Sequence, residues 1–259
     1  MSTTHPMSAP VPSLSERNAA TRRPRGRAVV HQRWAHLLFV HWQASPEALA
    51  RLLPAGLDLD TFEGHAFVGL VPFTVTGTRP RWTPALPFFS RFHEVNLRTY
   101  VHRGGRDPGV WFFSLDAGSL LAVQGARAWY RLPYRLARIR LELGSGGTGQ
   151  EVSCEARRVW PGPLPAACSM RYGPAGAMAP AVPGTLEHFL IERYVLYGAS
   201  RGRLYRARVH HPRYPVQAAT VDGLEETFSR AAGVSLMGPA LPSLYAREVE
   251  VEVFPPVRL

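Results

Sequence analysis

The chain of 259 residues contains no lysine, because all 30 of its Lys and Arg positions are Arg. A Schiff base with a carbonyl substrate needs a primary amine, and no side chain of this chain supplies one. Enzymes that work through a lysine imine are therefore excluded. A compositional bias toward Arg explains the absence of lysine, but whatever its origin, this absence leaves no side chain that can form a Schiff base.

Cysteine is scarce as well. Cys154 and Cys168 are the only two, and their spacing matches neither a disulfide framework nor a zinc motif. We expect two reduced thiols and a cytoplasmic location. The ten His residues form no HExxH motif, and the sequence has neither a phosphate loop nor a Gly-x-Ser-x-Gly elbow. We therefore predict no metal and no cofactor.

Long apolar runs are also missing, so we predict no membrane partner. The net charge of +11 could serve a nucleic acid. However, the Arg residues beyond the N-terminal stretch are scattered and match no RNA-binding or helix-turn-helix signature, which predicts no nucleic-acid partner. Residues 1–28 are rich in Ser, Pro and Arg without an apolar period, which is typical of a disordered basic tail. Residues 29–259 are predicted to form a single domain.

The polar residues of greatest interest lie in the stretch 92–135. Strict alternation from Glu94 to Tyr100 predicts a strand, because successive side chains of a strand point to opposite faces. One face carries an acid, an amide, a guanidinium and a phenol: Glu94, Asn96, Arg98 and Tyr100. This face could be a solvent-exposed sheet edge or the lining of an enclosed space. The apolar run Val110–Leu115 favours the second, since such a run suits a strand covered on both sides.

The following segments complete the predicted architecture. Asp116 is expected to cap a helix from about Ala117 to Tyr130. A corner at Leu132–Arg135 ends this helix, because Pro133 disfavours helical geometry, and an extended segment Leu136–Leu143 leaves the corner. The stretch 161–183, rich in Pro, Gly and Ala, predicts a long surface loop. About ten strands joined mostly as hairpins, with three or four short helices, predict an α+β fold that is mainly antiparallel β, with a barrel or a curled sheet.

A carboxyl enclosed beside a guanidinium is a candidate for general acid–base work, because enclosure perturbs its protonation. Glu94 and Arg98 form such a pair on one strand face. Tyr134 and Arg135 could add a phenol and a second guanidinium, and a cation beside Tyr134 would favour its phenolate. The structural alternative is a buried ion-pair network around Glu94, with Arg98, Arg127 or Arg135 as its partner. The residues alone leave these alternatives equal.

Several segments together resemble the uncharacterised bacterial YqjF-like family, over about Arg33 to Pro256. They read RWAHLLFVHW, LLPAGLDLDTFEGHAFVGLVPF, FHEVNLRTYV, GVWFFSLDA, ARAWYRLPY, FLIERYVLY, VHHP and VEVFPP. This family is similar to the acetoacetate-decarboxylase-like superfamily. The resemblance implies a cone-shaped, mostly antiparallel β-barrel with a few short peripheral helices and a small-molecule cavity within.

The resemblance also implies positions for a site. In the decarboxylases, a strand Glu, a Leu-Asp pair, a helix Arg and a Tyr-Pro-Lys-Lys corner recur, and the first Lys of the corner forms the Schiff base. They correspond here to Glu94, to Leu115-Asp116, to Arg127 and to the corner Leu132–Arg135. Tyr134 then stands at the Schiff-base position and Arg135 at that of the supporting cation. The imine mechanism of the family cannot operate here, because the chain has no lysine.

The sequence thus predicts a barrel that binds an anionic small molecule, namely an organic acid or a carbonyl compound. If it is an enzyme, we expect a cofactor-free lyase or isomerase that moves a proton next to a carbonyl, with Glu94 and Tyr134 as base and acid. The predicted ligand-binding residues are Arg135, Arg98, Asn96, Arg127 and Asp116. A non-catalytic ligand-binding protein and a structural protein on the same fold stay open as alternatives. The decarboxylase relatives form large oligomers, so a homo-oligomer is among the assemblies open to this chain.

Overall fold

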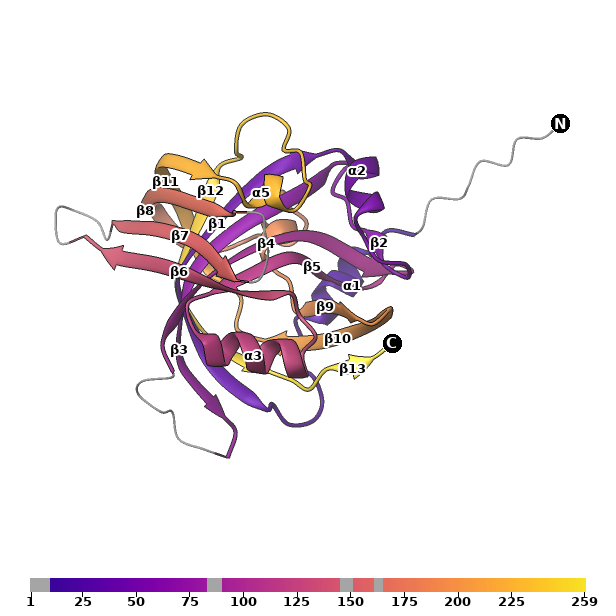
Figure 1. Cartoon of the computed structure of the whole chain (residues 1–259). Helices are drawn as coiled ribbons and strands as arrows, with labels where there is room; N and C mark the ends of the chain where they lie inside the picture. The colour runs from indigo at the N-terminus through magenta and orange to yellow at the C-terminus, as the bar shows by residue number, and fades with distance from the viewer. Residues whose placement is uncertain (1–9, 83–89, 145–150, 161–164) are drawn as a thin grey trace.

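The computed structural model describes residues 10–82, 90–144, 151–160 and 165–259. These residues form five short helices and thirteen strands, and all thirteen strands belong to one sheet (Figure 1). In chain order the elements are α1 (Leu14–Ala20), β1 (Val30–Ala44), α2 (Pro46–Arg51), β2 (Asp58–Leu59), β3 (Ala66–Pro80), β4 (Phe92–Arg103), β5 (Arg106–Ala117), α3 (Leu120–Trp129), β6 (Tyr134–Leu143), β7 (Val152–Trp160), β8 (Ala167–Pro180), α4 (Leu186–Ile191), β9 (Val195–Ser200), β10 (Arg203–His210), β11 (Pro215–Glu226), α5 (Phe228–Ala231), β12 (Ser243–Val253) and β13 (Val257–Arg258).

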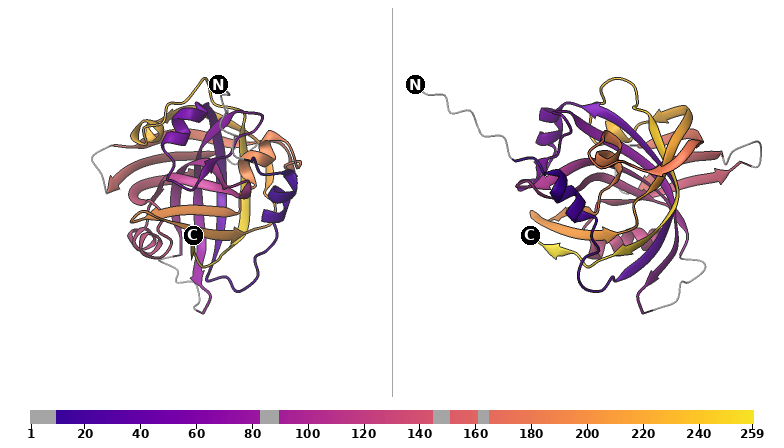
Figure 2. Two further views of the ribbon diagram at one scale, coloured as in Figure 1. Left: turned by 90° about the vertical axis from the view of Figure 1, so that its right-hand side faces the viewer. Right: turned by 180° about the vertical axis from the view of Figure 1, so that it is seen from behind.

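The sheet has the strand order β13-β10-β9-β5-β6-β7-β8-β11-β12-β1-β3-β4-β2. Two further pairings, β10–β12 and β5–β4, join strands that stand far apart in this order, so the sheet curls back toward itself (Figure 2). All pairings between the named strands are antiparallel except those of β5 with β6 and with β9. The predicted mainly antiparallel fold with a few short helices is confirmed, and the cone-shaped barrel stays a prediction.

The two faces of the central strands pack into two different hydrophobic clusters. On β1, Phe39 belongs to one cluster and its neighbour Val40 to the other. On β4, Tyr100 belongs to the first cluster and Leu97 to the second. This division follows from the period of two in a strand. We call the side of the sheet that carries Phe39 and Tyr100 the first face, and the side that carries Val40 and Leu97 the second face.

The helix predicted to start at Ala117 starts later in the chain. Ser119 caps α3, because its hydroxyl accepts a hydrogen bond from the Ala122 amide (3.3 Å). Asp116 is not a helix cap but lies in β5. The predicted cap at Asp116 was wrong because strand pairing continues through Ala117. In addition, the Asp116 carboxylate accepts two hydrogen bonds from Arg158.

The loop predicted over 161–183 was also wrong for most of its length. Residues 161–164 lie outside the described part of the chain, but Ala167–Pro180 form β8. This strand pairs with β7 on one side and β11 on the other, so its backbone groups are bonded from both sides. Ladder hydrogen bonds on two edges outweigh the weak strand preference of Pro, Gly and Ala, because strand preference depends strongly on context.

Part of the predicted disordered tail is ordered in the structure. Residues 1–9 lie outside the described residues, whereas Leu14–Ala20 form α1. Arg17 of this helix donates two hydrogen bonds, of 2.7 and 2.6 Å, to the two carboxylate oxygens of the fully buried Asp60. Arg193 donates a third bond to Asp60 (2.7 Å). Burial would raise the pKa of Asp60, but the charges of Arg193 and Arg17 outweigh it and hold this pKa below its usual value.

Replacing Arg17 by alanine is expected to lower the free energy of unfolding by about 1–3 kcal/mol, the usual loss for hydrogen bonds to a charged group. The loss stays moderate because Arg193 still pairs with Asp60. Urea unfolding measures it. Arg22→Ala is the control, since Arg22 is exposed on the same segment. Equal stability of the two variants would show that the Arg17–Asp60 pair does not hold this segment.

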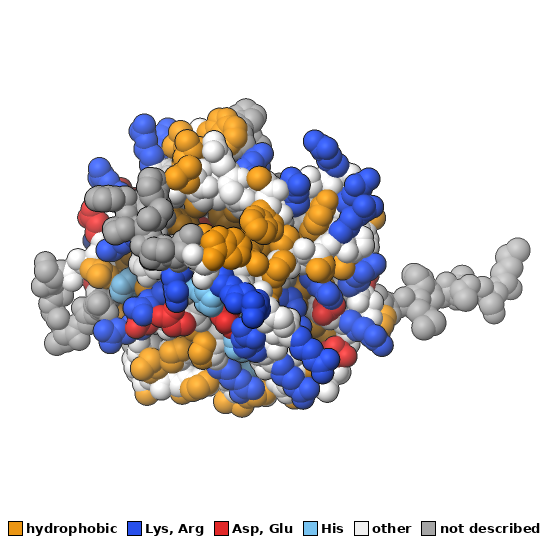
Figure 3. Space-filling view, turned by 90° about the horizontal axis from the view of Figure 1, so that it is seen from below, with side chains coloured by type: hydrophobic (Ala, Val, Ile, Leu, Met, Phe, Trp, Pro, Cys, Tyr) orange, Lys and Arg blue, Asp and Glu red, His pale blue; other side chains and the backbone are white. Residues whose placement is uncertain are grey.

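The surface reflects the composition. The face seen from below carries many Arg side chains among apolar patches and few acidic ones (Figure 3). Among the described residues, no helix has both the length and the apolar character that crossing a membrane requires.

Candidate functional site

Glu94 and Tyr134 form a hydrogen-bonded pair on the first face. The Tyr134 hydroxyl donates to Oε2 of Glu94 (3.1 Å), and Glu94 is buried. The pair forms because β5 lies between their two strands. Ala117 of β5 is the antiparallel partner of Glu94, and Leu115, two residues earlier, is the parallel partner of Tyr134. The central strand predicted from the apolar run therefore brings the two residues together.

The environment of this pair keeps both groups neutral at pH 7. Burial, assisted by the nearby charge of Asp116, raises the pKa of Glu94 from its ordinary 4.5 to about 8, although hydrogen bonds from Tyr134 and Asn96 oppose the shift. Burial and the neighbouring Glu94 raise the pKa of Tyr134 well above its usual value. The phenolate expected from an adjacent cation is therefore disfavoured. A neutral carboxyl and a neutral phenol can each donate a proton, and Glu94 becomes a proton acceptor when it ionises near pH 8.

Arg98 and Asn96 lie on the same face of β4 as Glu94 and are buried. Arg98 donates from Nη2 to the Leu190 carbonyl (3.2 Å), and its guanidinium lies 5.6 Å from the centre of the Phe39 ring. Among the described residues, Nε of Arg98 and Oδ1 of Asn96 have no hydrogen-bond partner. Buried polar atoms without partners are rare and call for an explanation, such as a bound water or ligand.

The ion-pair network offered as the structural alternative does not include Arg98 or Arg127. Within the described part of the chain, neither forms an ion pair with Glu94. The guanidinium of Arg98 therefore has no carboxylate partner among the described residues. A buried cation without a counter-ion is unfavourable, and an anionic ligand would relieve it.

Asp116 and Arg135 lie opposite each other on β5 and β6, on the second face. Arg158 of β7 holds the Asp116 carboxylate with two hydrogen bonds of 2.7 and 2.9 Å. Asp116 is fully buried, and the Arg158 side chain is 6% exposed. The acid predicted to bind a ligand is thus engaged in a bidentate ion pair, and it influences Glu94 through its charge.

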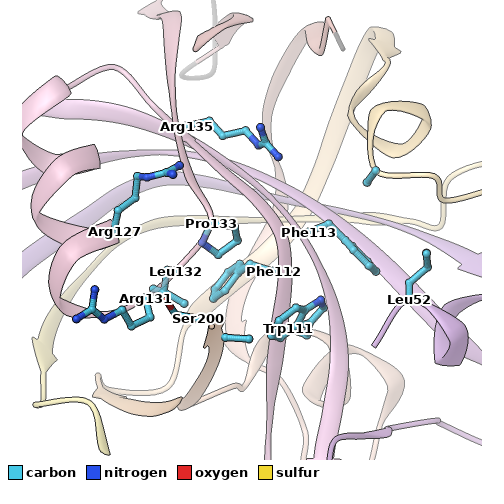
Figure 4. A pocket seen from close by; sticks show the side chains of 12 residues that line it. Leu52, Trp111, Phe112, Phe113, Arg127, Arg131, Leu132, Pro133, Arg135 and Ser200 are labelled. Carbon is cyan, nitrogen blue, oxygen red and sulfur yellow. The ribbon is translucent and has the colours of Figure 1, made fainter. Parts of the chain in front are cut away.

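Arg135 and Arg127 line a groove that lies beside the Leu132–Arg135 corner (Figure 4). We call it the corner groove. Its volume is about 620 Å³, and its lining residues are Leu52, Trp111, Phe112, Phe113, Arg127, Arg131, Leu132, Pro133, Arg135, Ala199, Ser200 and Ala232. Glu94 and Tyr134 are not among them. Apart from Asp116, which pairs with Arg158, the predicted site residues are therefore divided between a buried cluster on the first face and the corner groove.

Three of the lining residues, Trp111, Phe112 and Phe113, are consecutive in β5. In a regular strand they would alternate between faces. A register shift occurs here, because Leu97 pairs with Ser114 while Arg98 pairs with Phe112. Phe113 is therefore the extra residue of a bulge, which re-aims side chains.

Sequence reasoning missed several of these residues. Arg131 directly precedes the corner Leu132–Arg135, and this position, two residues before Pro133, is the available signal. Trp111 and Phe113 were inside the apolar run and had been assigned only to the core. Arg158 gave no local signal, because it is 42 residues from Asp116 in the sequence. Among the described residues, no group of three or more His, Cys, Asp and Glu side chains could hold a metal ion.

The fold is that of the acetoacetate-decarboxylase-like proteins. The structure matches an acetoacetate-decarboxylase-like enzyme from Sphingomonas wittichii RW1 with a TM-score of 0.60 and 17% sequence identity, over 90% of this chain and 94% of that one. It also matches the enduracididine biosynthesis enzyme MppR complexed with pyruvate, with a TM-score of 0.60 and 14% identity, over 90% and 91% of the two chains.

The chain belongs to the DUF2071 family, described as an uncharacterized conserved protein, whose model matches residues 31–250. It is 35% identical over 232 residues to the uncharacterized protein YqjF of Bacillus subtilis (strain 168), which covers 90% of this chain and 93% of that protein. The family expected from the sequence segments is thereby confirmed.

Proposed function

We propose that this protein binds a small organic acid or carbonyl compound at the buried cluster of Glu94, Tyr134, Asn96 and Arg98, and moves a proton next to the carbonyl without a cofactor. The observation that carries the proposal is the buried carboxyl of Glu94, hydrogen-bonded to a phenol and with its pKa raised to about 8. Perturbed carboxyls of this kind are frequent at catalytic sites.

The proposed chemistry is the reversible formation of an enol. Glu94, in its carboxylate form, takes a proton from the carbon next to the carbonyl, and the C–H electron pair becomes the new C=C bond. The C=O π pair moves to the carbonyl oxygen, which receives a proton from Tyr134, and the Tyr134 oxygen regains a proton from the newly protonated Glu94 along the hydrogen bond that joins them. A base of pKa about 8 is stronger than an ordinary carboxylate, and this favours proton abstraction. Arg98 is the candidate partner for a carboxylate of the substrate, and Asn96 for a hydroxyl or a protonated group.

Two further facts support a carbonyl substrate and limit the mechanism. MppR, which shares the fold, has been solved with pyruvate. The chain has no lysine, so no side chain can form an imine, and the proposed reaction proceeds on the free carbonyl. The proposal includes a cone-shaped barrel around the cluster, which the β5–β4 and β10–β12 pairings and the separate packing of the two sheet faces support.

Hydrogen–deuterium exchange at carbon tests the proposal. We expect the protein to catalyse exchange of the methyl protons of pyruvate in D₂O, followed by proton NMR, at a rate that rises up to about pH 8 as Glu94 ionises. Glu94→Gln and Tyr134→Phe should each lower the rate by about 10²–10⁴-fold, the usual contribution of a general acid or base.

Glu250→Gln is the control, because Glu250 is exposed on β12. The proposal is contradicted if the Glu94 and Tyr134 variants exchange as fast as the control. It is also contradicted if the unmodified protein does not exceed buffer with pyruvate, 2-oxobutyrate and acetoacetate.

The second candidate is a non-catalytic binding protein on the same fold. The unpartnered Nε of Arg98 and Oδ1 of Asn96 favour it, because they support binding without requiring any reaction. Pyruvate would then raise the melting temperature while its methyl protons did not exchange, and Arg98→Gln would remove the stabilisation.

A further inference from the structure

We propose that the corner groove is a second ligand site, separate from the buried cluster, and that it binds an organic anion with a flat or extended apolar body. A carboxylate, sulfonate or phosphate group would contact the arginines, and the apolar body would lie against β5. The proposed proton transfer assigns no role to this groove.

The first argument for an anionic ligand is the positive charge of the residues that line the groove. Arg127, Arg131 and Arg135 line the groove, and no Asp or Glu is among the described residues that do so. Asp116, which lies opposite Arg135 across β5 and β6, accepts two hydrogen bonds from Arg158. Burial, then the charges of Arg158 and Arg127, lower the pKa of Arg135, and Asp116 only partly offsets them. Several guanidinium groups around one hollow favour an anion there.

The second argument, for a ligand with an apolar body, is the apolar part of the lining. Trp111 and Phe113 present partly exposed rings, and Leu132 and Pro133 border them. Figure 4 shows these apolar side chains below the guanidinium groups of Arg127 and Arg135 in the same hollow. Ligand sites of proteins usually combine an apolar lining with a few polar groups, and the volume of about 620 Å³ falls in their usual range.

The groove is built in advance of any ligand. Arg131 has a positive φ of 57°, a conformation that a non-glycine residue adopts at some cost. Gly198 of β9 permits the close approach of this turn, because a Cβ atom there would lie 2.8 Å from the Arg131 carbonyl oxygen. Arg127 is fixed by a hydrogen bond from Nη1 to the Tyr134 carbonyl (2.8 Å), and it lies 5.4 Å from the centre of the Trp160 ring.

Glu94 and Tyr134 do not line the groove, although Phe112 and Leu132 of its lining belong to the first-face cluster. Tyr134 packs against the first-face cluster, whereas the next residue, Arg135, lines the groove. A ligand in the groove therefore does not contact Glu94. The two sites should respond to different substitutions.

Two fluorescent probes test the proposal on the full chain. 8-Anilinonaphthalene-1-sulfonate carries an anionic group, and N-phenyl-1-naphthylamine has the same aromatic body without it. We expect the sulfonate to bind about tenfold more tightly or better, because charge-assisted hydrogen bonds add to the apolar contact. Arg135→Gln and Arg127→Gln should each remove most of this preference and leave the neutral probe unchanged within about twofold. Arg127 is exposed on α3, so its variant is expected to fold even if the Arg135 variant does not.

Arg138→Gln is the matched control. Arg138 is exposed on the same strand and lines a different surface pocket of about 430 Å³. The proposal is overturned if the two probes bind equally, or if Arg138→Gln weakens the sulfonate as much as Arg127→Gln does. Glu94→Gln should strongly lower deuterium exchange and leave sulfonate binding intact, so failure of the groove proposal and failure of the proton-transfer proposal are distinguishable.

Discussion

Replacing Asp116 by alanine should lower the free energy of unfolding by about 3–5 kcal/mol, the usual cost of removing one partner of a buried ion pair. Asp116 is fully buried and accepts two hydrogen bonds from Arg158, whose side chain is 6% exposed. Without the carboxylate, the guanidinium of Arg158 stays in an apolar setting over the ring of Phe228 (5.5 Å) with no counter-ion. Urea unfolding at pH 7 measures the loss.

Two comparisons make this test specific. Glu250→Ala breaks the exposed pair with Arg33 and should cost less than about 1 kcal/mol, because exposed ion pairs contribute little. The double variant Asp116→Ala with Arg158→Met should recover part of the stability, since no buried charge is left without a partner. If Asp116→Ala is no more destabilising than Glu250→Ala, the pair does not carry the stability assigned to it.

The sequence predicts the strands better than it predicts the direction of side chains at their ends. Strict alternation from Glu94 to Tyr100 placed four polar residues on one face of β4, and the structure agrees. The extended segment after the corner was predicted to start at Leu136, but β6 starts at Tyr134. Because the strand starts at Tyr134, the side chains of Tyr134 and Arg135 point to opposite faces of the sheet. A prediction that treats these two residues as an irregular corner gives no side-chain direction for them.

Partners that are distant in the sequence could not be predicted. Asp116 looked like a helix cap because Asp is a favoured cap residue and a helix follows it. Its actual partner, Arg158, comes from β7, which reaches β5 only through β6. Arg17 looked like one charge of a polar tail for the same reason, since its partner Asp60 is 43 residues away. A local sequence pattern contains no information on such contacts. The resemblance to the family, in contrast, predicts that Glu94 and the Leu132–Arg135 corner belong to one site.

The two sides of the corner are linked by charge although they do not share a cavity. Asp116 on the second face raises the pKa of Glu94 on the first face, in addition to the effect of burial. The bidentate contact with Arg158 fixes the Asp116 carboxylate in this position. By fixing the position of the Asp116 charge, the ion pair therefore influences the pKa of the proposed base Glu94, besides its role in stability.

The raised pKa of Glu94 makes the stability of the protein depend on pH. The folded-state pKa is about 8 and the ordinary value is 4.5, so the folded state holds a proton that the unfolded chain releases between these values. Below about pH 4.5 Glu94 is protonated in both the folded and the unfolded state, so its ionisation does not lower the free energy of unfolding. As pH rises from 4.5 to 8, the free energy of unfolding should fall by up to about 4–5 kcal/mol from this group, and it should level off above pH 8.

Glu94→Gln isolates this effect, because the carboxamide keeps the size of the side chain and does not titrate. The difference in unfolding free energy, variant minus unmodified protein, should therefore grow from pH 5 to pH 8, measured by urea unfolding at each pH. All other titrating groups cancel in this difference unless they interact with Glu94. Tyr134→Phe removes a hydrogen bond that favours the carboxylate, so it should move the midpoint of the change to higher pH. A difference that stays constant over this range would contradict the raised pKa of Glu94, on which the proposed proton transfer depends.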